Sequence, residues 1–181
     1  MQEPIAQDSA AAAHHHFGPV GQTLFKLTKL LSIAGGLVFV LLVIMSIVSI
    51  TGRKLFASPI PGDVELLEVC SAFAAASFFA YCHLNGGDVK VDFFTAHASR
   101  STAHALDAMG SMLVAVFGGL ITWRASAAAL SVKAAGDTTM ILGLPLWWGQ
   151  ILMIPGFVLL CASGLYMCAW HLSMRSQKEL A

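Results

Sequence analysis

The chain has few charged residues. Only 11% of its 181 residues are Asp, Glu, Lys or Arg, whereas 57% are hydrophobic and the mean hydropathy is +0.75. An ordinary soluble domain carries about 25% charged residues, so this chain has too little polar material to cover a water-facing surface. The same composition excludes an intrinsically disordered chain, which requires low hydrophobicity and high charge.

The chain also lacks a net charge and a cysteine framework. Ten Lys and Arg residues balance ten Asp and Glu residues, so no basic field indicates nucleic-acid binding. Four cysteines are too few for a secreted disulfide scaffold, and no pair of them has C-x-x-C spacing. We interpret them as small apolar core residues. The class that remains is a multi-pass membrane protein.

Long apolar segments are the most prominent feature of the sequence. An apolar helix of about 20 residues crosses a hydrocarbon core of about 30 Å. The predicted spans are residues 30–50, 64–84, 108–132 and 146–171. The first is interpreted as a retained span, because no small-residue cleavage site of a signal peptide follows it. We therefore predict an all-α membrane protein with four transmembrane helices.

These spans lie in a predicted membrane domain of residues 24–172. Residues 1–23 are interpreted as a disordered tail, and residues 173–181 as a cytoplasmic tail. The run His14-His15-His16 is taken as part of the flexible tail or as a tag remnant rather than a metal site. Positive charges outside the spans favour both termini in the cytoplasm, with six on that side against three on the other. The six are Lys26, Lys29, Lys90, Arg100, Arg175 and Lys178, and the three are Arg53, Lys54 and Lys133.

The uncharged region 138–170 is too long for one span. Pro145 suits the first turn of a helix, so residues 138–144 are predicted to be an interfacial or re-entrant segment before the fourth helix. Pro155 lies within that helix and predicts a kink. Trp147 and Trp148 stand where an aromatic belt would place them.

Few ionisable residues lie within the spans, although such residues usually mark an ion or solute path. Arg124 is the one charge in 108–132; it is interpreted as a snorkelling interfacial anchor, or as an ion-pair partner for another subunit or a lipid phosphate. Glu65 and Glu68 share a helix face. They are interpreted as a helix start favoured by the dipole, with Asp63 as the N-cap, or alternatively as a proton or cation site.

Small residues recur at helical spacing on two predicted spans. One stripe is Ala72, Ala76 and Ala80, and the other is Ser111, Ala115 and Gly119. Such stripes let helices approach closely in lipid. They predict packing of these two helices against each other, or docking of either one onto another subunit.

No catalytic, cofactor-binding or metal-ligating set can be assembled from the sequence. It contains no Gly-rich phosphate loop and no G-x-S-x-G or H-E-x-x-H motif, so we expect a protein that is not an enzyme. His83 with His171 leaves open a haem- or quinone-binding membrane anchor of a redox complex. A small autonomous channel or carrier is a further alternative.

Three segments resemble the small permease subunit of tripartite ATP-independent periplasmic (TRAP) transporters. Residues 53–66, RKLFASPIPGDVEL, resemble the family's R-x-x-F-x-x-P-x-P-G-x-x-E-L stretch. Residues 86–94, GGDVKVDFF, resemble its G-x-H-V-R-V-D turn, with Asp88 in place of the common His and Lys90 in place of Arg. Residues 138–148, TTMILGLPLWW, resemble its T-x-x-L-x-x-P-x-W run, and Ile154-Pro155-Gly156 resembles its later P-hydrophobic-G motif.

The resemblance implies a subunit of a sodium-driven organic-acid importer in the bacterial inner membrane. A periplasmic substrate-binding protein would deliver the substrate, and a large permease would hold the sodium and substrate sites. The small subunit would bind membrane lipids, brace the large permease and help dock the binding protein. Its interface or structural candidates are Arg53, Glu65, Glu68, Asp92, Arg124, Pro145, Trp147, Trp148 and Pro155.

Overall fold

The computed structural model describes residues 18–87 and 100–179, with side chains for 18–87 and 105–173. The predicted contact residue Asp92 and the histidines at 14–16 lie outside these ranges. The described chain forms four helices, and it is an all-α multi-pass membrane protein, as predicted. The helices are α2 (Pro19–Phe56), α3 (Asp63–Leu84), α4 (Arg100–Ala135) and α5 (Trp147–Glu179), each long and apolar enough to cross a membrane.

The helices extend beyond the predicted spans. α2 begins at Pro19, so the predicted tail 1–23 is wrong for its last residues. α5 continues to Glu179 and takes in most of the predicted tail 173–181. Hydropathy marks the apolar part of a helix, whereas a helix ends where breaking residues occur. Pro19 suits a first turn, and residues 172–179 contain neither Gly nor Pro.

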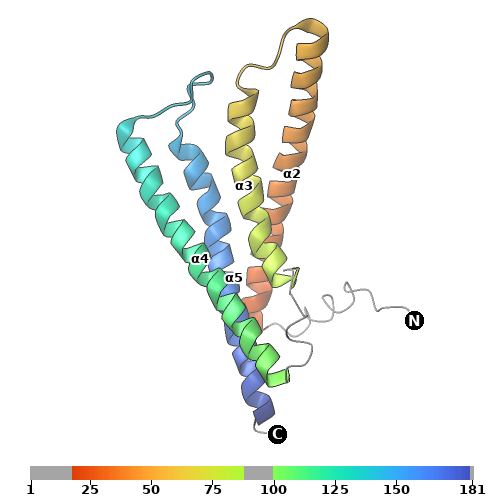
Figure 1. Ribbon diagram of the computed structural model, residues 1–181, viewed down its shortest axis with the longest axis vertical. Helices are drawn as coiled ribbons and strands as arrows, with labels where there is room; N and C mark the ends of the chain where they lie inside the picture. Colours follow the sequence, from red (N-terminus) through yellow and green to blue (C-terminus); the bar gives the residue numbers. More distant parts are fainter. Residues whose placement is uncertain (1–17, 88–99, 180–181) are drawn as a thin grey trace, which may run out of the picture.

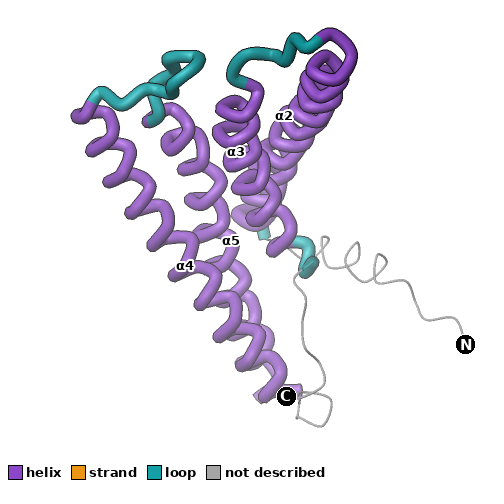
Figure 2. The backbone as a smooth tube through the Cα atoms, turned by 45° about the horizontal axis from the view of Figure 1, so that its top comes forward, coloured by secondary structure: helices purple, strands orange, loops and turns teal. Residues whose placement is uncertain are grey.

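The four helices lie side by side in the order α4, α5, α3, α2 (Figures 1 and 2). The main contacts join α4 to α5, α3 to α5 and α2 to α3. The α2/α3 and α4/α5 pairs diverge toward the end that carries the α2–α3 and α4–α5 connections, here called the loop end (Figures 1 and 2). The start of α2 and the end of α5 lie toward the opposite end (Figure 1). α5 is therefore the central helix that joins the two pairs through α3.

α2 packs on α3 along a seam of small residues. Its buried positions recur every seven residues and are Gly21, Thr28, Gly35, Leu42 and Ser49. A Cβ atom at Gly35 would lie 2.7 Å from Cβ of Ser77 on α3. A strict seven-residue repeat keeps one helix line against its neighbour, and small residues allow the close approach that stabilises helix pairs in lipid.

The two predicted small-residue stripes both pack against α5. Ala76 on α3 faces Gly156, where an added Cβ would lie 2.6 Å from the Ala76 carbonyl oxygen. Ala115 on α4 faces Gly164, where an added Cβ would lie 2.7 Å from the Ala115 backbone nitrogen. The prediction that the stripes pack against each other is therefore wrong. Each stripe packs closely against a glycine, and both glycines lie on α5.

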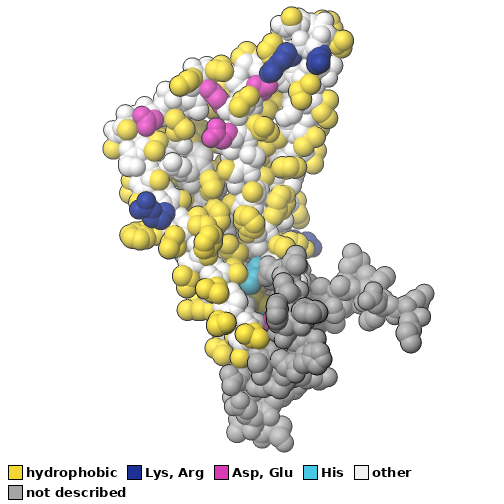
Figure 3. Space-filling view, viewed as in Figure 1, with side chains coloured by type: hydrophobic (Ala, Val, Ile, Leu, Met, Phe, Trp, Pro, Cys, Tyr) yellow, Lys and Arg dark blue, Asp and Glu magenta, His cyan; other side chains and the backbone are white. Residues whose placement is uncertain are grey.

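Many large apolar side chains are exposed on the outside of the molecule, and yellow side chains are spread over the face that Figure 3 shows. Leu37 on α2 is 64% exposed, and Leu113 on α4 has the same exposed fraction. The largest fully buried side chains, by contrast, are Thr28, Ser49, Ser77 and Ser163. Exposed apolar surface on this scale indicates contact with lipid or with another protein. Cys82 is also exposed, so its interpretation as a core residue is wrong.

Candidate functional site

The turn between α2 and α3 is held by a polar cluster at the loop end. The hydroxyl of Ser49 donates to Oδ2 of Asp63 at 2.5 Å, and the backbone N–H of Ile60 donates to Oγ of Ser49 at 3.3 Å. Nη2 of Arg53 lies 3.5 Å from the same Asp63 oxygen. Arg53 is 60% exposed, so this ion pair contributes little stability. The predicted contact residue Arg53 thus lies against its own chain.

The start of α3 differs from the prediction at one position. The N-cap is Gly62, with φ of 75°, and Asp63 is the first helical residue. Asp63 accepts from the N–H of Val64 at 2.9 Å, but its other oxygen is used by Ser49. The predicted N-cap role of Asp63 is therefore wrong. The tight turn after Pro61 requires a residue in the left-handed backbone conformation, which glycine adopts without a Cβ clash.

Glu65 links α3 to the connection between α4 and α5. Its Oε1 accepts from the backbone N–H of Ile141 at 2.8 Å, and its Oε2 accepts from the N–H of Leu142 at 3.0 Å. Leu142 also covers Gly62, where an added Cβ would lie 2.4 Å from Cγ of Leu142. A carboxylate with both oxygens bonded to backbone donors is a charge-assisted fork. This contact connects the α2/α3 pair to the α4/α5 pair at the loop end, where the two pairs diverge.

The connection itself, residues 137–146, is a hairpin (here, the 137–146 hairpin). The N–H of Thr139 donates to the Leu144 carbonyl at 2.8 Å, and the N–H of Leu146 donates to the Asp137 carbonyl at 3.1 Å. It lies at the ends of α4 and α5 and does not descend between helices (Figure 1). Of the two predicted alternatives, the re-entrant segment is not formed. Met140 at its tip is 99% exposed.

Pro145 belongs to the hairpin rather than to the helix. It pairs with Thr138 in an isolated bridge, and α5 begins at Trp147. The predicted helix-start position of Pro145 is therefore wrong, because the bridge to Thr138 and the hydrogen bond from Leu146 to the Asp137 carbonyl keep this part of the chain in the hairpin. Pro155, as predicted, lies inside α5. There it removes one backbone donor.

The two tryptophans at the start of α5 form an aromatic pair. The rings of Trp147 and Trp148 lie 5.9 Å apart at an interplanar angle of 73°. Nζ of Lys133, near the end of α4, lies 5.0 Å from the centre of the Trp147 ring. Trp148 is 58% exposed. Aromatic rings beside a lysine are typical of a membrane–water boundary, so this level of the molecule is the natural boundary at the loop end.

Glu68 lines a cavity of about 390 Å³ below the 137–146 hairpin, between α3 and α5. Gln150 contributes its side chain, whose Oε1 is buried without a hydrogen-bond partner in the described part of the chain. Glu65 borders the same space. No group of three His, Cys, Asp or Glu side chains that could hold a metal occurs among the described residues. Of the predicted pair, Glu65 is engaged with the hairpin and Glu68 faces the cavity.

Arg124 lies on the exposed surface of α4, beside Trp123, which is 70% exposed. Because α4 continues to Ala135, Arg124 lies about three turns from the helix end. The snorkelling interpretation assumed a helix end only two turns away. None of the other described residues forms an ion pair with Arg124. The structure therefore separates Arg124 from Arg53 and Glu65, which lie at the loop end.

Sequence reasoning missed Ser49 and Gln150, and it included Gly62 within the family motif at residues 53–66. The seven-residue repeat of Gly21, Thr28, Gly35, Leu42 and Ser49 could have indicated the buried position of Ser49. Gly62 after two prolines signals a turn, although not its contact with Leu142. Nothing in the sequence signals that Gln150 borders the same cavity as Glu68.

Comparison with known protein families identifies a matching family. The family model described as "Tripartite ATP-independent periplasmic transporters, DctQ component" matches residues 40–172. The match includes α3, the 137–146 hairpin and most of α5. No curated protein sequence matches the chain.

Proposed function

The chain belongs to the DctQ component family of tripartite ATP-independent periplasmic transporters, and we propose that it braces the large permease of a sodium-driven organic-acid importer. A DctQ component is a small membrane subunit of a transporter. Its proposed partners are therefore the large permease and the binding protein of the same transporter. In this proposal, sodium and substrate bind to the large permease, and the chain performs no chemistry and holds no cofactor.

The observation that carries this proposal is how the helices use their small residues. Glycines of α5 and α2 pack against other helices of the same chain, whereas many large apolar residues are exposed on the outside. A side-by-side arrangement of this kind presents broad surfaces for lipid and for a partner. Such surfaces suit a stationary support, which widens the membrane-embedded part of the transporter.

The proposed orientation places both termini in the cytoplasm, with the chain in the bacterial inner membrane. The Glu65 link and the 137–146 hairpin then face the periplasm, where the binding protein delivers substrate. Met140 and Ile141 are exposed at the hairpin tip, with 99% and 65% of their surface accessible. We infer that this tip contributes to docking of the periplasmic binding protein.

Co-purification tests the scaffold proposal directly. The chain is expressed with the large permease of its own transporter and extracted in a mild detergent. We expect the two polypeptides to elute together, and elution of the chain alone would contradict the proposal. Liposomes containing the chain alone should take up neither sodium nor organic acid, since uptake would identify an autonomous carrier. A Soret band in the pure protein would instead support the haem-anchor alternative.

A further inference from the structure

Arg124 is a cation on an apolar surface. Its side chain is exposed on α4, and the described residues of the chain provide it with no ion pair or hydrogen bond. Its exposed neighbours on α4 are apolar and include Leu120 and Trp123, with 53% and 70% of their surface accessible. An unpaired charge in such a position is costly in lipid and marks a functional contact.

The depth of Arg124 follows from its distance to the boundary residues. Lys133, stacked on Trp147, marks the boundary at the loop end. Arg124 precedes Lys133 by nine residues, which is about 14 Å along a helix and about half of a 30 Å hydrocarbon core. The Cα–Cβ bonds of a helix tilt toward its N-terminus, so the side chain of Arg124 leaves the backbone away from that boundary. Lipid phosphates, which lie at the boundary, are therefore poorly placed to neutralise it.

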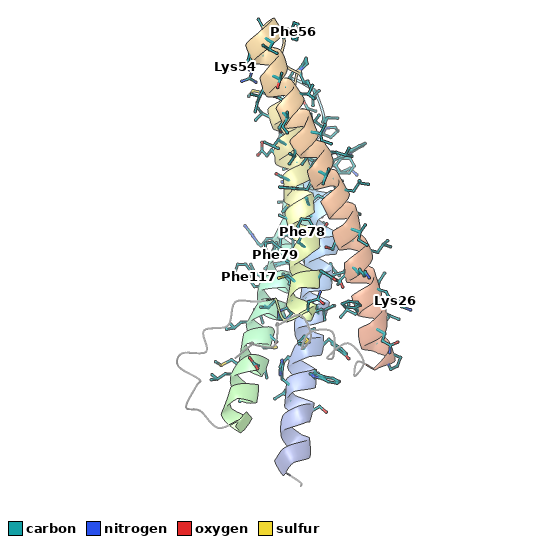
Figure 4. The ribbon with its side chains drawn as sticks, turned by 90° about the vertical axis from the view of Figure 1, so that its right-hand side faces the viewer. Lys26, Lys54, Phe56, Phe78, Phe79 and Phe117 are labelled. Atoms are coloured by element: carbon teal, nitrogen blue, oxygen red, sulfur yellow. The ribbon has the colours of Figure 1, made fainter. Side chains whose placement is uncertain are left out.

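An apolar groove borders α4 about two turns before Arg124. Phe117 precedes Arg124 by seven residues and so lies on the same line of α4, about 10 Å away along the axis. It lines a groove of about 400 Å³ formed by α3, α4 and α5. Phe79 from α3 lines the groove as well, and Figure 4 shows Phe79 and Phe117 close together on one side of the molecule. The groove can accept a bulky apolar side chain from a neighbouring helix.

We propose that Arg124 forms an intramembrane ion pair with an Asp or Glu on a transmembrane helix of the large permease. The same partner helix places an apolar side chain in the groove beside Phe117, about two turns along. A carboxylate is the favoured partner because a guanidinium binds it through two parallel hydrogen bonds, and because a helix can carry it to the membrane centre. This inference rests on the proposed function and identifies the surface through which the subunit is held.

Charge variants test the ion pair in the assembled complex. Wild type, Arg124→Gln, Arg124→Lys and Arg124→Glu are co-expressed with a tagged large permease, and the bound small subunit is quantified. Lys54→Gln is the matched control, since Lys54 lies at the far end of α2 (Figure 4). Removing one partner of a desolvated pair is strongly destabilising, so recovery of Arg124→Gln and Arg124→Glu should fall at least about tenfold. Arg124→Lys should retain more, and Lys54→Gln should match wild type.

Two further measurements separate a lost contact from a lost fold. Helix content and elution profile of each variant without the permease should match those of wild type. A photoreactive residue at Leu120, which is 53% exposed between Phe117 and Arg124, should form an adduct with the large permease. Replacing one membrane-embedded acidic residue of the permease with Arg should restore binding of Arg124→Glu.

The outcomes distinguish this inference from the proposed function. Undiminished recovery of Arg124→Gln would overturn the ion pair, as would adducts of position 120 with lipid alone. Failure of every acidic-to-Arg replacement to restore Arg124→Glu would also overturn it. In these cases the wild-type subunit still binds the permease and the scaffold role stands. Failure of the wild-type subunit to bind would contradict the proposed function itself.

Discussion

The carboxylate of Glu65 accepts a hydrogen bond from the backbone N–H of Ile141, 76 positions later in the chain, at 2.8 Å. The bond from Leu142 to the other oxygen makes the contact two-pronged. The α2/α3 and α4/α5 pairs diverge toward this end (Figure 1), and Glu65 spans the opening between them together with the contact of Leu142 with Gly62. Glu65, an acidic residue in the first turn of α3, therefore contributes to the relative placement of the two pairs at the loop end.

Replacing Glu65 with Gln should loosen the 137–146 hairpin. An amide offers one acceptor oxygen, and its NH2 group would face a backbone N–H with no acceptor between them. We expect amide hydrogen exchange at Ile141 and Leu142 to accelerate roughly tenfold, which corresponds to the loss of about 1.4 kcal/mol of local stability. Glu68→Gln is the matched control, because Glu68 lines the cavity beside the hairpin. Equal exchange in both variants would show that Glu65 does not hold the hairpin.

Replacing Gly62 with Ala should destabilise the loop end through two effects. Its φ of 75° is unfavourable for alanine, and the added Cβ would lie 2.4 Å from Cγ of Leu142. Gly136→Ala isolates the first effect, because Gly136 has φ of 72° but nothing within 4 Å of an added Cβ. We expect Gly136→Ala to cost about 1 kcal/mol and Gly62→Ala about 2–4 kcal/mol, measured by thermal unfolding in detergent. Equal losses of stability in the two variants would show that the Leu142 side chain moves aside without a measurable cost.

Hydropathy was sufficient to predict the four helices, because an apolar segment of spanning length has few other stable structures in a membrane. It did not predict where α2 and α5 end. Those ends depend on breaking residues, and residues 172–179 provide none. Pro145 illustrates the opposite error: a residue that suits a helix start is held outside the helix by the pairing of Leu146 with Asp137.

The candidate site was harder to predict than the helices. Glu65 was identified from its position at a helix start, but its partners are backbone groups far along the chain, which carry no sequence signature. The small-residue stripes at Ala76 and Ala115 correctly indicated close packing. Their common neighbour, α5, could not be identified, because a stripe shows that a helix approaches closely but not which one.

Replacing Gly156 with Val should separate α3 from α5. Even an alanine Cβ would lie 2.6 Å from the carbonyl oxygen of Ala76, and a backbone carbonyl cannot move aside as a flexible side chain can. We expect a loss of roughly 2–4 kcal/mol in stability and weaker binding to the large permease, measured by thermal unfolding and co-purification. Gly110→Val on α4 is the control, because nothing lies within 4 Å of its added Cβ. Comparable destabilisation by both variants would mean that helix propensity, rather than the contact with Ala76, sets the cost.

Replacing Met140 and Ile141 with Ser should weaken binding of the periplasmic binding protein without weakening that of the large permease. The tip carries apolar side chains that are 99% and 65% exposed, and Glu65 holds its backbone in place. A preorganised apolar tip binds without an ordering cost, so losing it should raise the Kd for the binding protein about tenfold. That Kd is measured by surface-immobilised titration of the complex. Leu55→Ser is the control, since Leu55 is 71% exposed near the end of α2. An unchanged Kd for the double variant would place the docking surface elsewhere, and a parallel loss of the large permease would assign the hairpin to the subunit interface.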